Sequence, residues 1–220
     1  MGANFCVRHA QGRRSPQRNL RRPPAVSLML GPEPLGGSLA EKTDHELMAA
    51  TGRGDLHALG VLFERHHARV HALCYRLTGD ASVADDLVQE SFLRILRYRK
   101  GFGARAAFTT WLYRLVRNVC MDHLSAEATN RTRAEAMVWD QHEQDRNDAA
   151  ESDPRLETLR AALYVLPPDK REVLVLSRYE GLSYAEIAEV CETTVGAIKV
   201  RAHRAMRELR QNFEELERAT

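Results

Sequence analysis

The chain has 220 residues, of which 44% are hydrophobic and 28% are charged, as is typical of a globular protein. No stretch approaches the roughly 20 consecutive apolar residues that a membrane-spanning helix needs. The formal net charge of +2 does not by itself indicate nucleic-acid binding, and four scattered cysteines do not form a disulfide scaffold.

Residues 1–38 contain six Arg, five Pro and five Gly and show no helical periodicity, so we predict a disordered basic tail. Its role is open: it is a tail without function, the product of a start codon assigned too far upstream, or a basic arm that adds non-specific DNA affinity. The apolar run 25–30 follows Arg21 and Arg22 as in a twin-arginine export signal, but it is short and flanked by prolines. We therefore predict a cytoplasmic protein.

Residues 43–126 are predicted to form one helical domain. Thr43 can cap a short helix with Glu46 in its first turn. Three longer helices follow at about 55–77, 80–97 and 107–126, with a glycine-containing loop at 98–105. Apolar residues recur at three- and four-residue spacing in each helix, so that the helices can bury a common core.

His67 and His71 lie one helical turn apart, and Cys74 is a third nearby side chain that can bind a metal. This spacing is compatible with a metal enzyme, but no HExxH glutamate is present. The alternative is a pair of partly exposed helix histidines, and we expect no metal and no cofactor.

Residues 127–154 contain an excess of acids, with nine acids and four bases between Glu127 and Glu157. They lack a sustained apolar stripe, which indicates a flexible linker with at most transient helix. A second domain, 155–217, is predicted to contain four helices separated by Pro167-Pro168, Gly181 and the turn at Glu192. The expected fold class is all-α, with two small helical domains joined by the acidic linker.

The last two predicted helices have the spacing of a helix-turn-helix. Ser183 caps the first, Glu192 and Thr193 form the turn, and Ile198 anchors the second helix inward. The residues expected to point from that second helix toward duplex DNA are Thr194, Lys199, Arg201 and Arg204. The alternative is an ordinary helical hairpin with a basic, solvated face.

Three segments resemble the extracytoplasmic-function (ECF) sigma factors of bacterial RNA polymerase. Residues 166–209 resemble the family's fourth conserved region, and Asp85–Leu96 resembles its DDLVQE segment. The pattern Phe108, Trp111, Arg114, Asn118 and Asp122 resembles the segment that follows. The resemblance covers about 43–126 and 156–215 in the family's order, and it implies a sigma factor without catalytic activity that directs promoter-specific transcription initiation.

The resemblance implies that the helix with the DDLVQE segment docks on a basic coiled coil of the polymerase. Asp85, Asp86, Gln89 and Glu90 would give this helix an acidic outer face, which would speed and orient docking. The alternative is that these acids only solvate the helix and interact favourably with its N-terminal dipole.

The same resemblance implies that the first domain binds the melted minus 10 element as single-stranded DNA. Between Arg94 and Arg117 there are seven Lys or Arg and no acid. The residues expected to contact melted DNA are Tyr98, Arg99, Lys100, Arg105, Trp111, Arg114, Arg117 and Asn118, with Phe102 and Tyr113 as further stacking candidates. Phe108 is expected in the core, and Trp111 is either a core or a stacking residue.

The chain departs from the family pattern at three places. Glu192 replaces the usual glycine of the turn, which costs roughly 1–2 kcal/mol if the left-handed conformation is kept. Val200 and Ala202 in the second helix of the motif leave the base contacts open. The segment after Asp122 is nearly neutral, so that phosphate contacts are expected to shift to Arg131 and Arg133.

The resemblance further implies two partners besides promoter DNA, which are core RNA polymerase and an anti-sigma protein. We expect no membrane insertion, and association with the nucleoid when the protein is bound to polymerase. A different class remains open: a regulator that binds duplex DNA through the helix-turn-helix and senses a signal through its first helices. That class does not need the basic aromatic stretch at 94–117.

Overall fold

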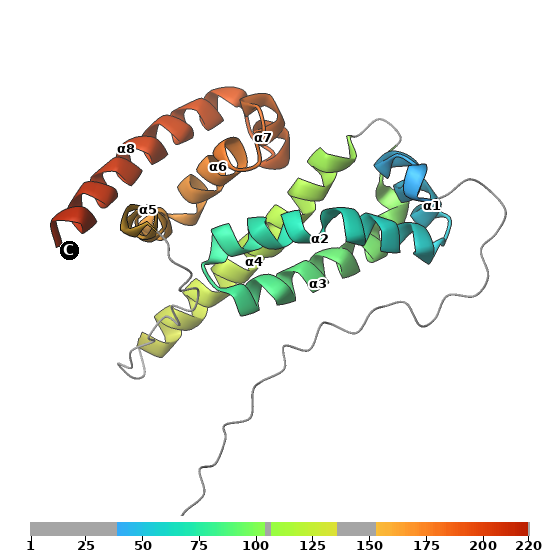
Figure 1. Ribbon diagram of the computed structural model, residues 1–220, viewed down its shortest axis with the longest axis horizontal. Helices are drawn as coiled ribbons and strands as arrows, with labels where there is room; N and C mark the ends of the chain where they lie inside the picture. Colours follow the sequence, from blue (N-terminus) through green and yellow to red (C-terminus); the bar gives the residue numbers. More distant parts are fainter. Residues whose placement is uncertain (1–38, 104–106, 136–152, 220) are drawn as a thin grey trace, which may run out of the picture. The chain divides into compact units, whose positions relative to one another are not determined.

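The computed structural model describes residues 39–103, 107–135 and 153–219, which contain only helices and their connections (Figure 1). The side chains of 131–135 are not among the described parts, so the phosphate contacts predicted for Arg131 and Arg133 lie outside them. The predicted basic tail, Arg105 and most of the predicted linker also lie outside these ranges. None of the described helices is long and apolar enough to cross a membrane.

The first domain contains two 3₁₀ turns, Leu39–Glu41 and Arg99–Gly101, and four α-helices. The helices are α1 (Asp44–Gly52), α2 (Leu56–Thr78), α3 (Ala81–Tyr98) and α4 (Phe108–Glu135). Thr43 and Glu46 form a reciprocal capping box, and the side chains of Asp55 and Asp80 accept backbone N–H groups at the starts of α2 and α3. These caps confirm the predicted helix starts, because each satisfies N–H groups that the helix itself leaves free.

The core of the first domain lies between α2, α3 and α4. Leu62, Leu73 and Leu77 of α2 and Ile95 of α3 are almost completely buried, and Phe108 at the start of α4 joins them as predicted. Phe92 of α3 is also buried and packs edge-on against Phe63. Burial of these side chains is the main stabilising contribution of the domain.

Helix α4 continues to Glu135, whereas we predicted its end near Ala126 and a linker from residue 127. The side chains of 125–130 are exposed, which explains why no apolar stripe marked this part of the helix. Alanine, glutamate and arginine have high intrinsic helix propensity and extend a helix that has already nucleated. The first nine residues of the predicted linker are therefore helical.

The second domain contains α5 (Pro154–Val165), α6 (Pro168–Arg178), α7 (Tyr184–Val190) and α8 (Val195–Ala219). Proline occupies the first position of both α5 and α6, where no backbone N–H is needed. Leu174 and Leu176 of α6, Ile187 of α7 and Ile198 of α8 meet in its core. The all-helical, two-domain fold that we predicted is thereby confirmed.

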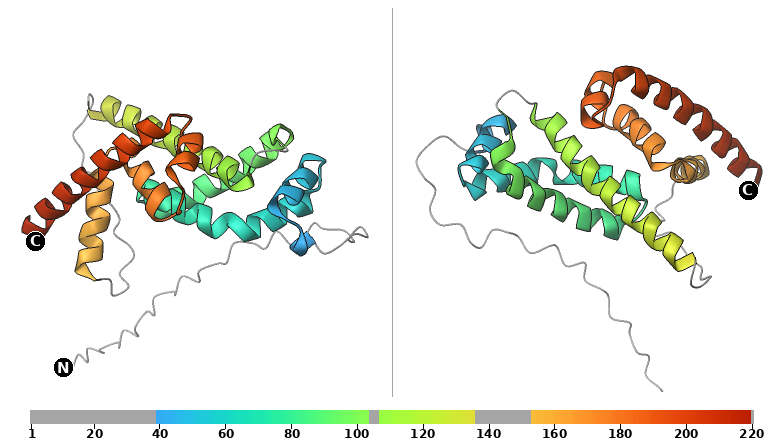
Figure 2. Two further views of the ribbon diagram at one scale, coloured as in Figure 1. Left: turned by 90° about the horizontal axis from the view of Figure 1, so that it is seen from above. Right: turned by 180° about the vertical axis from the view of Figure 1, so that it is seen from behind.

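The two domains also pack against each other. We had predicted only a flexible linker between them. Helices α6 and α7 lie on α2 and α4 (Figure 2), and the described residues from 39 onward form one compact unit. The Tyr164 ring covers Gly79, where an added Cβ would approach it to 3.2 Å. Its hydroxyl donates to the Tyr75 carbonyl oxygen at 3.3 Å.

Candidate nucleic-acid interface

Helices α7 and α8 form the predicted helix-turn-helix. A capping box between Ser183 and Glu186 starts α7, and the Thr193 N–H donates to the Ala188 carbonyl oxygen at 2.9 Å to close the turn. Glu192 adopts a left-handed backbone with φ of 52°, which is the condition under which we expected a strain cost at this position. A side chain there costs roughly 1–2 kcal/mol relative to glycine, so the turn geometry is imposed by the packing of the two helices.

Helix α8 has one buried face and one exposed face. Ile198, Ala202 and Ala205 are buried, so Ala202 belongs to the core and is not available for base contact. The exposed side chains in its first half are Val195, Lys199, Val200, His203, Arg204, Met206 and Arg207. Two of the predicted duplex-binding residues, Lys199 and Arg204, are therefore accessible to DNA.

The side chains of Thr194 and Arg201 make polar contacts within the second domain. The Thr194 hydroxyl accepts the Ala197 N–H at 3.2 Å and so caps α8. The Arg201 guanidinium does not point freely outward as we expected, because it lies 3.4 Å from Glu172 and 3.7 Å from Asp169, and 29% of its side chain is exposed. Its availability for phosphate depends on release from these two carboxylates.

The outer face of α3 is acidic, as predicted. Asp85, Asp86 and Gln89 are exposed, and Glu90 forms an ion pair of 2.8 Å with Arg94. Leu93, one helical turn beyond Gln89, is also exposed, with 56% of its surface accessible. Leu93 was not among the residues predicted for this face, although its spacing to Asp86 and Gln89 places it there. Acids around an exposed leucine suit a basic protein partner.

The aromatic residues near the start of α4 divide into exposed and buried ones. Tyr98 is exposed, whereas Trp111 is partly buried, with its ring 5.4 Å from that of Phe102. Tyr113 is not available for stacking on a base, contrary to our expectation. Its ring is buried, and its hydroxyl donates to Glu180 at 2.7 Å.

The predicted phosphate-binding side chains of the first domain differ in availability. Lys100 is exposed, whereas the Arg99 guanidinium donates to the Leu96 carbonyl oxygen. Arg114 lies 3.5 Å from Glu192, and Arg117 donates to Glu172 at 2.9 Å.

Asn118 is half-buried beside Arg117. Its side-chain oxygen accepts a hydrogen bond from the Arg117 guanidinium at 3.1 Å. This bond holds the Asn118 amide close to the basic side chains of α4, on the side where Arg117 meets the second domain.

The histidines considered as metal ligands have other partners. A ring nitrogen of His67 lies 3.0 Å from the Phe63 carbonyl oxygen, and His71 lies 3.4 Å from Asp85. Cys74 is buried with its sulfur 3.6 Å from that of Cys120. In the described ranges, no group of three or more potential ligand side chains is placed to hold a metal ion.

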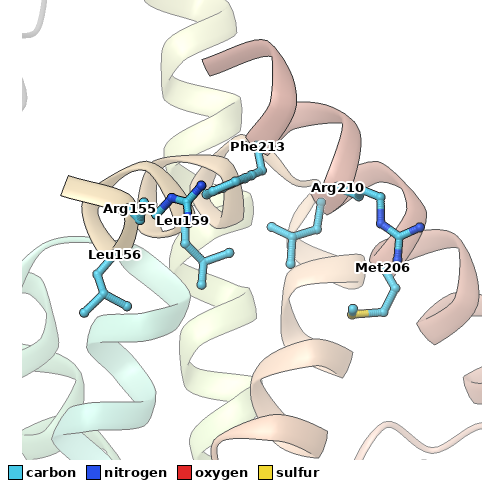
Figure 3. A pocket seen from close by; sticks show the side chains of 7 residues that line it. Arg155, Leu156, Leu159, Met206, Arg210 and Phe213 are labelled. Carbon is cyan, nitrogen blue, oxygen red and sulfur yellow. The ribbon is translucent and has the colours of Figure 1, made fainter. Parts of the chain in front are cut away.

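A shallow apolar groove runs between α5 and α8 (Figure 3). It was not predicted from the sequence. Its lining residues are Arg155, Leu156, Leu159, Met206, Leu209, Arg210 and Phe213. Leu156 and Leu159 of α5 lie three residues apart, a spacing that is also typical of core-facing leucines in a helix. Only the packing of the two helices shows that these side chains border an open surface.

Three charged side chains at the domain boundary were not predicted to be buried: Arg171, Glu172 and Glu180. All three are buried despite their charge. A signal for two of them is present in the sequence, because Arg171 and Glu172 directly precede the apolar run Val173–Leu176 in a helix. Charged residues are almost never fully buried unless they are paired.

Together, these features define an all-helical DNA-binding protein with a helix-turn-helix in its second domain and an acidic outer face on α3 of its first. Residues 62–129 match the Sigma-70 region 2 family, and residues 156–209 match Sigma-70, region 4. The chain is 31% identical to the RNA polymerase sigma-H factor of Pseudomonas aeruginosa over 76% of its length and 92% of the relative. It is 30% identical to the ECF RNA polymerase sigma factor SigW of Bacillus subtilis, over 74% and 93% of the two chains.

A structural comparison agrees with these matches. The structure of CnrH in complex with the cytosolic domain of CnrY aligns with a TM-score of 0.59 and 25% identity, covering 79% of this chain and 99% of CnrH. The chain therefore belongs to the ECF sigma factors of bacterial RNA polymerase, and its function is in transcription initiation.

Proposed function

We propose that this sigma factor holds a promoter at two separate places while its first domain also binds core polymerase. Helix α8 would read the duplex minus 35 element, and the segment from Tyr98 to Asn118 would bind the melted minus 10 element. The observation that carries this proposal is the pairing of an exposed basic recognition helix with a basic, aromatic segment in a separate domain. No catalytic activity of its own is part of the proposal.

Duplex recognition would rest on the exposed face of α8. An α-helix fits the major groove, where base edges are distinguishable, and Lys199 and Arg204 are placed to contact phosphates or bases. Arg201 would join them once it leaves Glu172. The capped N-terminus of α8 at Thr194 would orient the helix on the sugar–phosphate backbone.

Polymerase binding would use the acidic face of α3, because Asp85, Asp86 and Gln89 are exposed around Leu93. A related structure contains CnrH bound to the cytosolic domain of CnrY. For this chain, an anti-sigma protein that covers the α3 face would block the binding of polymerase. Bound to polymerase, the protein would be associated with the nucleoid.

The decisive experiment is reconstitution with purified core polymerase. The full-length chain should bind the core enzyme and produce promoter-specific run-off transcripts from a pool of genomic promoter fragments. Asp86→Lys should reduce core binding several-fold, because it reverses a charge in the docking face. Glu214→Lys on α8 is the matched control, since it reverses an exposed acid elsewhere. A chain that binds DNA but never redirects the polymerase would be a duplex-binding regulator instead.

The role of Asn118 in melting has a separate test. Asn118→Ala should lower the permanganate reactivity of thymines in the minus 10 element roughly tenfold, because a lost hydrogen bond to a flipped base costs about 1–2 kcal/mol. Core binding by the variant should stay at the level of the unmodified protein. Unchanged melting together with unchanged base preference would remove Asn118 from the site.

A further inference from the structure

The face of α8 that lies opposite its buried side carries a row of exposed residues, which we call the outer stripe. Ile198, Ala202 and Ala205 mark the buried side, and residues three or four positions apart share one side of a helix. The outer stripe consists of Gly196, Lys199, Val200, His203, Arg204 and Arg207. Four of these six residues have basic side chains, so Val200 is the one apolar side chain of the stripe.

Val200 lies near the middle of the outer stripe, and 50% of its surface is exposed. Valine has lower helix propensity than lysine, arginine or glutamate, because its branched side chain loses rotamer freedom against the preceding turn. An exposed valine therefore stabilises α8 less than a long polar residue would. Its place among cations on the proposed DNA-binding face points to a contact with the DNA rather than with the rest of the chain.

Gly196 lies one helical turn before Val200 on the same stripe. A Cβ added at Gly196 would have the Thr194 hydroxyl as its neighbour, at 3.9 Å, so the space outside this turn is open. The missing side chain lets the helix backbone come close to a partner surface. Val200 needs such a close approach, because its methyl groups extend less far from the helix than the ends of lysine and arginine side chains.

The chemistry of the major groove limits what a valine can recognise there. The C5 methyl group of thymine is the apolar group that the base pairs present in this groove. The other exposed groups are hydrogen-bond donors and acceptors, and valine would displace water from them without replacing its hydrogen bonds. Valine also strongly prefers one χ1 rotamer in a helix, so its two methyl groups are presented in a fixed position.

We propose that Val200 determines base specificity in the upstream duplex element by contacting the methyl group of a thymine. Lys199 and Arg204, on the two flanks of the stripe, would hold phosphates or neighbouring bases, while Val200 selects one T·A pair. The family pattern differs at this position, so the preference belongs to this chain. The inference rests on the proposed function, because it names a base contact within the duplex element that α8 would read.

Replacement of thymine by uracil tests the contact, since it removes the C5 methyl group and leaves base pairing and phosphates intact. The most active promoter fragment from the polymerase reconstitution supplies the duplex, and each thymine of its minus 35 element is replaced in turn on either strand. Affinity of the reconstituted holoenzyme is measured by fluorescence anisotropy at one fixed salt concentration. At one position the replacement should weaken binding about fourfold, which corresponds to the loss of contact by one methyl group.

Three variants of the full-length chain assign this sensitivity to a residue. Val200→Ser removes both methyl groups, and the ratio of thymine to uracil affinity should fall close to one. Val200→Ile keeps the apolar surface and should keep the ratio. Val195→Ser is the matched control, because Val195 is 40% exposed on the same helix but lies roughly 140° around its axis from Val200. The control should keep the ratio of the unmodified chain.

Equal affinity for thymine and uracil at every position would overturn the methyl contact, as would a minus 35 element without an A·T pair. A sensitivity that survives Val200→Ser would overturn the role of Val200. A chain that fails to bind core polymerase or to direct initiation would overturn the proposed function, and this inference with it. A working holoenzyme that is indifferent to the methyl group overturns this inference alone, so the two failures are distinguishable.

Discussion

The two domains carry similar basic residues in very different surroundings. In the first domain, Arg117 is bound to a fully buried carboxylate and Arg114 faces Glu192. In the second domain, Lys199 and Arg204 project from the exposed face of α8. A count of charges along the chain assigns both regions to DNA equally well. Whether an arginine of the first domain is available to DNA therefore depends on which acids of the other domain lie opposite it.

The domains also differ in how they end a helix at a left-handed residue. In the first domain, Gly79 at the end of α2 has φ of 87° and carries no side chain that could clash. In the second domain, Glu192 takes the same kind of conformation in the turn of the helix-turn-helix with φ of 52°. Strain is thus concentrated next to the recognition helix.

The largest expected effect concerns the thiol at the domain boundary. Burial, followed by the charge of Glu172, raises the pKa of Cys191 to about 12. Its thiolate population near neutral pH should be on the order of a thousandfold below that of an ordinary cysteine, and alkylation by iodoacetamide should be slowed accordingly. Glu172→Gln should speed the reaction, because it removes the charge beside the thiol and loosens the boundary. Equal rates in native and unfolded protein would contradict this.

The raised pKa of Cys191 also fixes a pH dependence of stability. Below about pH 9 the thiol is protonated in both folded and unfolded chains, so its contribution is fully present there. Between about pH 9 and 12 the unfolded chain loses the proton while the folded chain keeps it, so stability falls as pH rises. Burial likewise raises the pKa of Tyr164 to about 12, which adds to the fall. Denaturant titrations of Cys191→Ala should show a smaller fall than those of the unmodified chain.

Next in size is a pair of core substitutions that tests whether the domains unfold together. Ile95 and Ile198 are completely buried, one in each domain. Replacing either by alanine should lower the free energy of unfolding by about 3 kcal/mol, through lost burial and a residual cavity. Guanidinium titrations followed by circular dichroism would measure this loss. If the ion pairs across the domain boundary couple the domains, both variants should keep a single transition. Independent domains would show a shift in only one of two transitions.

The smallest expected changes in the free energy of unfolding come from substitutions at the two left-handed residues, Glu192 and Gly79. Glu192→Gly should raise the free energy of unfolding by about 0.5–1 kcal/mol, because relief of strain exceeds the added flexibility of the unfolded chain. Gly79→Ala is the converse and should destabilise the first domain by about 1–2 kcal/mol, since its new Cβ also meets the Tyr164 ring. Thermal melts of both variants would measure these changes. A destabilised Glu192→Gly would show that the Arg114 contact outweighs the strain.

Much of the fold followed from local patterns. The capping residues Thr43, Asp55, Asp80 and Ser183 start helices where we predicted, because the caps act within three residues of themselves. The sequence left open whether Glu192 takes the left-handed conformation, and the structure shows that it does. The end of α4 was not predicted, since its last turns carry no apolar stripe.

The sequence predicted most of the residues of the candidate site, but not which of their side chains are buried by contacts with distant residues. The acidic face of α3 and the exposed Lys199 and Arg204 follow from helical spacing. We predicted Tyr113 as a stacking residue, yet its ring is buried and its hydroxyl donates a hydrogen bond to Glu180, 67 residues later. No periodicity within α4 carries that information.

The sequence alone determined the helices, their caps, the helix-turn-helix and the family, because each depends on interactions between near neighbours or on motif order. Only the tertiary structure decided which charges are buried and which arginines face solvent. The physical reason is that the cost of burying a carboxylate depends on donors that the chain brings together from distant positions, as at Glu172 and Glu180. Such pairings arise when the domains pack, and neither domain contains them by itself.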